Sequence, residues 1–274
     1  MTPDGALRFE LPRISLPGGR GRQMSEQPLE PELEAFLLRI VPGLAEAWRG
    51  CTPEEIAQVE LIAGRPLPSF YRWFLSRMGR SMGPLAYPTL DFSAQRVLAC
   101  YADGLISTDP RFLLIAYETD EMMSEHLFYD FSASTREDAL VTRRDAEGGP
   151  LSDMFSTLRE MLARGALFRF RVRKMPQQCD GMVRGNNPDF LSHLDSAMSR
   201  LGFTKPISTG HRCRLYDRPD AAMICDGLPR GGVENRLSFT LGGSSDGALR
   251  RILGEVAMEP SLEVKVYRWT PELR

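Results

Sequence analysis

The sequence predicts an α+β protein built from two successive regions, each combining helices with antiparallel strands. Helical periodicity dominates the early chain, and short apolar runs separated by polar turns begin near residue 111. Near residue 168 the alternation of strand-like and helix-like segments starts again. At 274 residues the chain is longer than a typical domain of ~100–200 residues. We therefore expect a flexible tail over residues 1–29, a first domain over 30–166 and a second over 167–274.

Composition is that of an ordinary globular protein. Hydrophobic residues make up 42% and charged residues 26%, and the formal net charge is −2. These values argue against a disordered, collagenous or membrane-spanning chain. Residues 1–167 contain 17 Lys and Arg against 24 Asp and Glu, whereas residues 168–274 contain 17 against 12. Because the halves have opposite net charges, we expect them to present different surfaces.

The number of cysteines and the lengths of the apolar segments indicate the cellular compartment. The five cysteines are too sparse for a disulfide framework, and their odd number would leave one thiol unpaired in an oxidising environment. No segment reaches the ~20 apolar residues of a membrane helix. Residues 1–24 lack the apolar stretch of an export signal. We therefore expect a cytoplasmic protein with no membrane partner.

Capping residues locate the early helices. Residues 31–49 carry apolar side chains at helical spacing. Thr52 and Glu55 stand at the N-cap and third positions of the next helix, where their side chains can form a capping box. Gly64 ends that helix in the left-handed conformation. A proline bend and a strongly aromatic helix follow over residues 66–79.

Strand signals follow these helices. Residues 111–118, 125–131 and 139–143 are short runs rich in Leu, Ile, Tyr, Phe and Val. They predict consecutive antiparallel strands. A covering helix is expected from Ser152, which completes the first α+β region.

The second region is expected to begin at Phe168. Apolar and cationic side chains alternate over residues 168–173, which predicts a strand with one apolar and one cationic face. The cations of this basic stripe are Arg169, Arg171 and Arg173. They could contact phosphates or an acidic protein, and the competing interpretations are a solvated strand face or pairing with the acidic first domain. The remaining elements complete a β-α-β-β-β-α-β order, with helices over 189–201 and 248–258 and strands over 212–216, 221–225, 236–241 and 262–269.

One segment carries a family resemblance. Residues 51–84 are CTPEEIAQVELIAGRPLPSFYRWFLSRMGRSMGP, in which a short helix is followed by a proline bend and an aromatic helix. The positions that matter are Ile56, Glu60, Gly64, Leu67, Pro68, Tyr71, Phe74, Leu75 and Gly79. Their order and spacing resemble the SUKH superfamily, which includes a fungal cell-wall-synthesis regulator and many bacterial toxin-immunity proteins. The resemblance extends over residues 30–165, and residues 80–84 depart from the family's Gly-rich turn.

The resemblance implies a binding module without known catalysis. Bacterial members share a fold while neutralising unrelated toxins, often nucleases or nucleic-acid deaminases, so the fold does not identify the partner. We expect an immunity protein, not an enzyme, that neutralises a cognate toxin by stoichiometric binding. Two alternatives stay open: a multi-partner regulatory scaffold, and a nucleic-acid-binding protein acting through the basic C-terminal half. Nucleic acid is not the partner that we favour.

Acidic residues concentrate between the first two predicted strands. Carboxylates there can stand where the phosphates of a toxin's substrate would bind, and long-range attraction speeds capture. Met122 and Met123 lie beside them and could serve as apolar anchors. The competing interpretation is a solvated loop with no partner. The candidate partner-binding residues are Glu118, Asp120, Glu121, Glu125, Asp130, Tyr117 and Tyr129.

Catalytic and metal-binding motifs are not evident. His211, Cys213 and Cys225 could approach one another on strands, but no ligand spacing typical of zinc accompanies them, and buried structural cysteines are favoured. The glycine-rich segment 242–247 lacks the lysine of a phosphate-binding loop, so a helix cap at Ser245 or Asp246 is favoured. We assign no catalytic residue, no metal and no cofactor.

Overall fold

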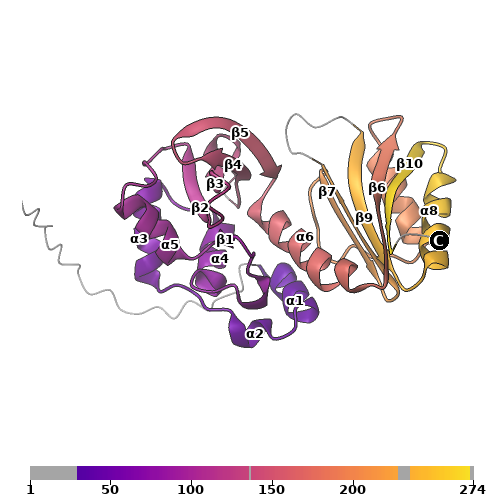
Figure 1. The fold of residues 1–274 in the computed structure, drawn as a ribbon, viewed down its shortest axis with the longest axis horizontal. Coiled ribbons are helices and arrows are strands. Elements are labelled where there is room, and N and C mark those ends of the chain that lie inside the picture. The colour runs from indigo at the N-terminus through magenta and orange to yellow at the C-terminus, as the bar shows by residue number, and fades with distance from the viewer. Residues whose placement is uncertain (1–29, 136, 228–234, 272–274) are drawn as a thin grey trace, which may run out of the picture.

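The computed structural model describes residues 30–135, 137–227 and 235–271, and the predicted tail over 1–29 lies outside the described residues. The fold is α+β, as predicted. It contains two five-stranded antiparallel sheets, with strand orders β1-β2-β3-β4-β5 and β10-β6-β9-β8-β7. Helix α6 (Leu158–Phe170) lies between the sheets (Figure 1). No helix in the described part of the chain combines the length and the apolarity that a bilayer span requires.

The first region begins with capped helices. The predicted capping box is confirmed, because Thr52 Oγ1 accepts the Glu55 N–H at 3.3 Å while Glu55 Oε2 accepts the Thr52 N–H at 2.7 Å. These two bonds satisfy donors that the first helical turn leaves unpaired. The elements are α1 (Pro31–Ile40), α2 (Leu44–Ala47), α3 (Pro53–Ala63), α4 (Ser69–Met78) and the 3-10 helix η1 (Gly83–Leu85).

The two glycines that end α3 and α4 are needed for different reasons. Gly64 has φ +61°, the left-handed conformation that was predicted, and a Cβ there would meet open space. Gly79 is right-handed, but a Cβ there would lie 2.6 Å from the Leu75 carbonyl oxygen and against Cys51 Sγ. Gly64 is therefore required by the backbone and Gly79 by close packing.

The first sheet has helices on both faces. Side chains of α4 pack with Leu113, Leu127 and Tyr129 on one face. On the other face Val97 of α5 packs against Leu114, and α5 was not predicted from the sequence. The elements are β1 (Leu90–Asp91), α5 (Ala94–Ala102), β2 (Phe112–Glu118), β3 (Glu125–Asp130), η2 (Phe131–Ala133), β4 (Leu140–Asp145) and β5 (Gly148–Phe155).

The helix predicted from Ser152 begins later. Residues 148–155 form β5 because two successive glycines with positive φ, Gly148 and Gly149, turn the chain back onto β4. The helix then starts at Leu158, and Thr157 Oγ1 accepts the Glu160 N–H at 3.1 Å.

The strand predicted over residues 168–173 is wrong. Helix α6 continues to Phe170 and is followed by the 3-10 helix η3 (Val172–Lys174). Alternation over six residues does not exclude a helix, and no Gly or Pro interrupts the chain between Gly165 and Pro176. The first strand of the second sheet is β6 (Gln177–Gly185), which follows Pro176.

The rest of the second region has the predicted order of elements. Helices α7 and α8 cover one face of the sheet (Figure 1). Ser245 caps α8, since its Oγ accepts the Ala248 N–H at 3.2 Å. The elements are α7 (Phe190–Arg200), β7 (Cys213–Arg218), β8 (Ala221–Asp226), β9 (Arg236–Gly243), α8 (Asp246–Ala257) and β10 (Leu262–Thr270).

A shared core joins the two regions. Leu167 of α6 belongs to one continuous apolar cluster with Leu215 of β7 and Ile224 of β8. Alternate residues of these strands, such as Met223, face the separate core under α7 and α8. The boundary predicted between residues 166 and 167 falls inside α6, so this helix contributes to the packing of both sheets.

Candidate functional site

The candidate surface forms where β2 turns into β3. Asp120 and Glu121 are exposed in this loop, and Glu125 is half-buried at the start of β3. Asp120 Oδ1 accepts the Met122 N–H at 3.0 Å, and the Asp120 carbonyl accepts the Met123 N–H at 3.0 Å. An aspartate side chain that bonds to the backbone two residues later stabilises such a turn. The loop is therefore built by its own hydrogen bonds.

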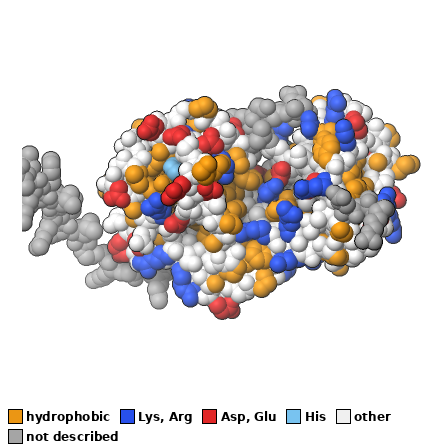
Figure 2. Space-filling model, in the orientation of Figure 1, with side chains coloured by type: hydrophobic (Ala, Val, Ile, Leu, Met, Phe, Trp, Pro, Cys, Tyr) orange, Lys and Arg blue, Asp and Glu red, His pale blue; other side chains and the backbone are white. Residues whose placement is uncertain are grey.

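Two further carboxylates, which were not among the predicted site residues, lie beside this loop. Asp145 stands opposite Glu125 in the β3–β4 pairing, and Glu147 is exposed in the next turn. Like charges at opposite cross-strand positions destabilise a sheet, so negative charge is concentrated here at an energetic cost. We call Asp120, Glu121, Glu125, Asp145 and Glu147 the acidic surface. In Figure 2, Asp and Glu side chains gather over the upper part of the first region, with hydrophobic side chains among them.

Glu118, a predicted partner-binding residue, supports the loop from inside. Its side chain is buried, and Oε1 accepts the Asp120 N–H at 3.2 Å. The other oxygen, Oε2, lies 4.0 Å from the Arg143 guanidinium. The prediction that Glu118 is part of an exposed edge is therefore wrong. Its position at the end of β2 turns the side chain inward, and there it fixes the loop backbone.

Two stacked rings and one guanidinium lie next to the acidic surface. The Tyr117 ring stacks on His126 at a centroid distance of 4.3 Å, and the Arg96 guanidinium lies 3.9 Å from the Tyr117 centroid. His126 Nδ1 accepts the Glu118 N–H at 3.1 Å. Burial lowers the pKa of His126, against the opposing effects of Asp145 and Glu118. The imidazole is therefore neutral at pH 7, as an accepting Nδ1 requires.

Two methionines lie among the carboxylates. Met122 is 89% exposed and Met123 is 42% exposed. Exposed apolar side chains of this size are adaptable contacts for a protein partner, because methionine has three rotatable bonds and a polarisable sulfur. The loop thus offers charge and apolar area together.

Asp130 and Tyr129 do not belong to this surface. Asp130 lies at the opposite end of β3, is fully buried, and its Oδ2 is 2.8 Å from Arg111 Nη2. Tyr129 is also fully buried, and its hydroxyl donates to Asp138 Oδ1 at 2.7 Å. The prediction that they flank the loop is wrong because β3 extends away from the loop, so residues near its far end are remote from the turn.

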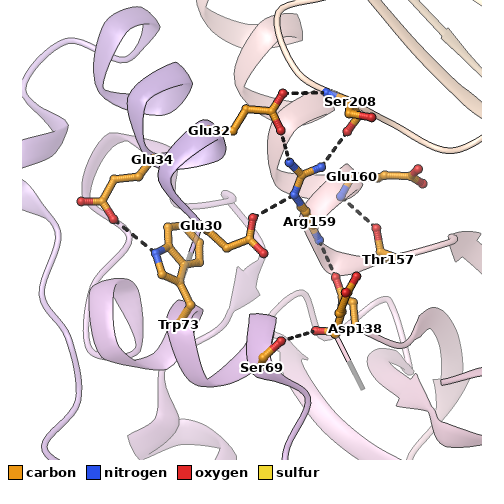
Figure 3. Close-up of polar contacts among 11 residues, drawn as sticks. Glu30, Glu32, Glu34, Ser69, Trp73, Asp138, Thr157, Arg159, Glu160 and Ser208 are labelled. Carbon is orange, nitrogen blue, oxygen red and sulfur yellow. Dashed lines mark hydrogen bonds and ion pairs between the residues drawn. The ribbon is translucent and has the colours of Figure 1, made fainter. Parts of the chain in front are cut away.

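Asp138 belongs to a buried polar junction at the start of α6 (Figure 3). Asp138 Oδ2 accepts the Arg159 N–H at 3.0 Å, and burial raises the pKa of Asp138 to about 6. The Arg159 guanidinium donates to Glu30 at 3.0 Å, to Glu32 at 2.8 Å and to the Ser208 carbonyl at 2.6 Å. Arg159 therefore ties the start of α1 to the second region, and we assign the junction a structural role.

The basic stripe is not a stripe. Arg169 donates to the Leu85 and Ala86 carbonyls at 2.6 and 2.8 Å. Arg171 forms an ion pair with Asp217 at 3.1 Å. Arg173 is exposed, with its guanidinium 5.0 Å from the Phe168 ring centroid. Because the backbone is helical here, the three side chains point in different directions. Arg169 anchors the end of α6 to the first region, and Arg171 anchors the following residues to β7 of the second region.

The cysteines and histidines of the second region do not converge. Cys213 and Cys225 lie on adjacent strands but face the two different cores, and burial raises the pKa of both thiols. His211 is exposed. Among the residues that the structure describes, no group of three or more potential metal ligands occurs.

A scan against protein-family models finds no matching family, and a search of curated proteins finds no significant match.

Proposed function

We propose that this protein captures a basic partner protein by stoichiometric binding at the acidic surface. One contrast carries the proposal. None of the five carboxylates of the acidic surface forms an ion pair with a described residue, whereas Glu34, Glu55 and Glu60 pair with nearby arginines. Unpaired carboxylates beside an exposed methionine combine long-range attraction with a desolvated anchor.

The partner is proposed to be a cognate toxin and the protein its immunity protein. The resemblance of residues 51–84 to the SUKH superfamily supports this more specific proposal. A toxin that binds nucleic acid has a cationic groove, and the carboxylates of the acidic surface would occupy the positions of phosphates there. A cytoplasmic location is part of the same proposal, and it rests on five cysteines that form no disulfide.

Genetics in the native host tests this proposal. Deleting the gene alone should arrest growth, and deleting it together with its neighbouring genes should restore growth, because the toxin is then also absent. Reintroducing the gene with Asp120→Lys and Glu121→Lys should rescue the single deletion less well than wild type. Normal growth of the single deletion while the neighbouring genes are expressed would contradict the immunity role.

A regulatory scaffold remains the second candidate. It predicts several endogenous partners that compete for the acidic surface, and no growth arrest that depends on a neighbouring gene. The two candidates can be compared by quantifying the proteins that wild type and the Asp120→Lys, Glu121→Lys variant capture from the same extract. Loss of one captured protein in the variant favours a single charge-dependent partner, and loss of several favours the scaffold.

A further inference from the structure

The second sheet has one face that helices cover only in part. Helices α7 and α8 cover the opposite face. On the partly covered face, α6 packs over β7 and β8, where Leu215 and Ile224 contribute to the shared core. The parts of β6, β9 and β10 beyond α6 present polar and charged side chains instead, and Arg184, Ser238 and Lys265 are not buried.

Cations on this face stand next to one another. Arg184 of β6 and Arg236 of β9 are directly opposite in the antiparallel register, and both are exposed. Neither forms an ion pair with a described residue. Like charges at opposite cross-strand positions destabilise a sheet, and an anion bound between them would relieve that repulsion. On its other side Arg184 stands opposite Glu263 of β10, whose carboxylate offsets part of that repulsion within the sheet.

The positive charge continues along the strands. Lys265 of β10 stands opposite Met182. Arg268 stands opposite Asp180 and forms an ion pair with it, with one hydrogen bond at 2.9 Å, so the Asp180 carboxylate offsets the Arg268 charge. At the far end η3 packs over Gly242 through the Val172 carbonyl and the Met175 side chain, and Arg173 and Lys174 of η3 are exposed nearby. We call Arg173, Lys174, Arg184, Arg236, Lys265 and Arg268 the cationic face. Figure 2 shows Lys and Arg side chains gathered where the two regions meet and over the second region.

An exposed aromatic ring lies among these cations. Tyr267 is 55% exposed, and its hydroxyl donates to Met182 Sδ at 3.5 Å, which holds the ring against the sheet. Lys265 Nζ lies 5.6 Å from the ring centroid. A base can stack on such a ring while the flanking ammonium contacts its phosphate. Phe168, half-buried beside Arg173, is a second ring near the same face.

We infer that the cationic face binds single-stranded nucleic acid. Cations along a strand direction match the spaced phosphates of an extended backbone, and an exposed ring on a sheet matches an unstacked base. A rigid duplex would keep its bases from that ring. An acidic protein segment would use the cations but gain little from the ring. The site is separate from the acidic surface, so it does not depend on the toxin-binding proposal.

Fluorescence anisotropy of a labelled oligothymidylate of about 20 nucleotides, titrated with the full chain, tests the inference. With about four phosphate contacts, affinity should fall roughly fifty-fold between 50 and 200 mM salt. Tyr267→Ala should weaken binding at least about fivefold without changing the salt dependence. Arg184→Glu with Arg236→Glu should weaken binding and make the slope of log K against log salt shallower by about 1.4. A duplex of the same length should bind more weakly than the single strand.

Arg251→Glu is the matched control. Arg251 is exposed on α8, on the covered side of the sheet, and its charge reversal should leave oligonucleotide affinity nearly unchanged. Circular dichroism should show that each variant is folded, and Arg184→Gln with Arg236→Gln replaces the Glu pair if that pair unfolds. Absence of salt-sensitive binding at 50 mM salt, or an equal loss in Arg251→Glu, would overturn the inference. A polyglutamate peptide should compete with the labelled oligonucleotide less well than an unlabelled oligonucleotide does. If the two competitors are equally effective and Tyr267→Ala does not change oligonucleotide affinity, the face binds an acidic protein instead, and the inference is overturned.

Discussion

Replacing Tyr129 by Phe removes one hydrogen bond from the buried junction while leaving the ring in place. The lost bond joins the hydroxyl to Asp138 Oδ1 at 2.7 Å, and both residues are at least nine-tenths buried. A hydrogen bond to a charged group contributes about 1.5–3 kcal/mol to stability. Asp138 keeps the backbone donors of Ala139 and Arg159, so it is not left without partners. We therefore expect Tyr129→Phe to lower the free energy of unfolding by about 1.5–3 kcal/mol at a pH of about 8.

The effect should depend on pH in a direction set by Asp138. Burial raises its pKa to about 6, so the carboxyl is ionised at pH 8 and mostly protonated at pH 5. The Tyr129 hydroxyl stabilises the ionised form, which means that its loss matters more at the higher pH. At about pH 5 the loss should shrink to that of a neutral hydrogen bond, roughly 0.5–1.5 kcal/mol.

Urea denaturation followed by circular dichroism, at both pH values, measures these losses. Tyr117→Phe is the matched control, because no hydrogen bond joins the Tyr117 hydroxyl to a described residue, and it should change stability little. A loss below about 0.5 kcal/mol in Tyr129→Phe at pH 8, or a larger loss at pH 5 than at pH 8, would refute the reasoning.

Three further predictions concern local structure. Gly79→Ala should destabilise by about 2 kcal/mol or more, because its Cβ meets the Leu75 carbonyl, while Gly64→Ala should cost only about 1 kcal/mol for its positive φ; equal losses in urea denaturation would contradict the two assignments. Thr52→Ala should cost about 1 kcal/mol by removing the capping-box acceptor, and an unchanged urea midpoint would contradict that. His126 should titrate below its ordinary pKa of about 6.5 in NMR spectra. Since its folded pKa is lowered, its contribution to stability should be present above pH 6.5 and lost as the pH falls, and a titration above 6.5 would contradict this.

The sequence predicted features that depend on a few adjacent residues. The capping box at Thr52 and the cap at Ser245 follow from spacing within one helical turn, and the left-handed Gly64 follows from helix termination. Apolar runs likewise located β2, β3 and β4. The alternation of apolar and cationic residues over 168–173 led to a wrong prediction of a strand, because six residues are too few to distinguish the periodicity of a strand from that of the end of a long helix.

The candidate surfaces could not be predicted from the sequence, because they depend on which residues of neighbouring strands stand opposite one another. Asp145 joins Glu125 only through the β3–β4 register, and Arg184 meets Arg236 only through the β6–β9 register. A shift of one residue would turn these side chains to the other face. Tyr129 was predicted to bind a partner because it is close in sequence to the acidic loop, and its burial on a two-sided sheet is a tertiary property that the local sequence does not encode.

If a toxin partner is identified as proposed, its association rate with the chain tests the central claim most directly. Stopped-flow fluorescence at low salt should show that Asp120→Lys with Glu121→Lys slows association by about tenfold or more relative to wild type, with the difference shrinking as salt screens the charges. A rate unchanged by the double substitution at low salt would contradict capture by the acidic surface.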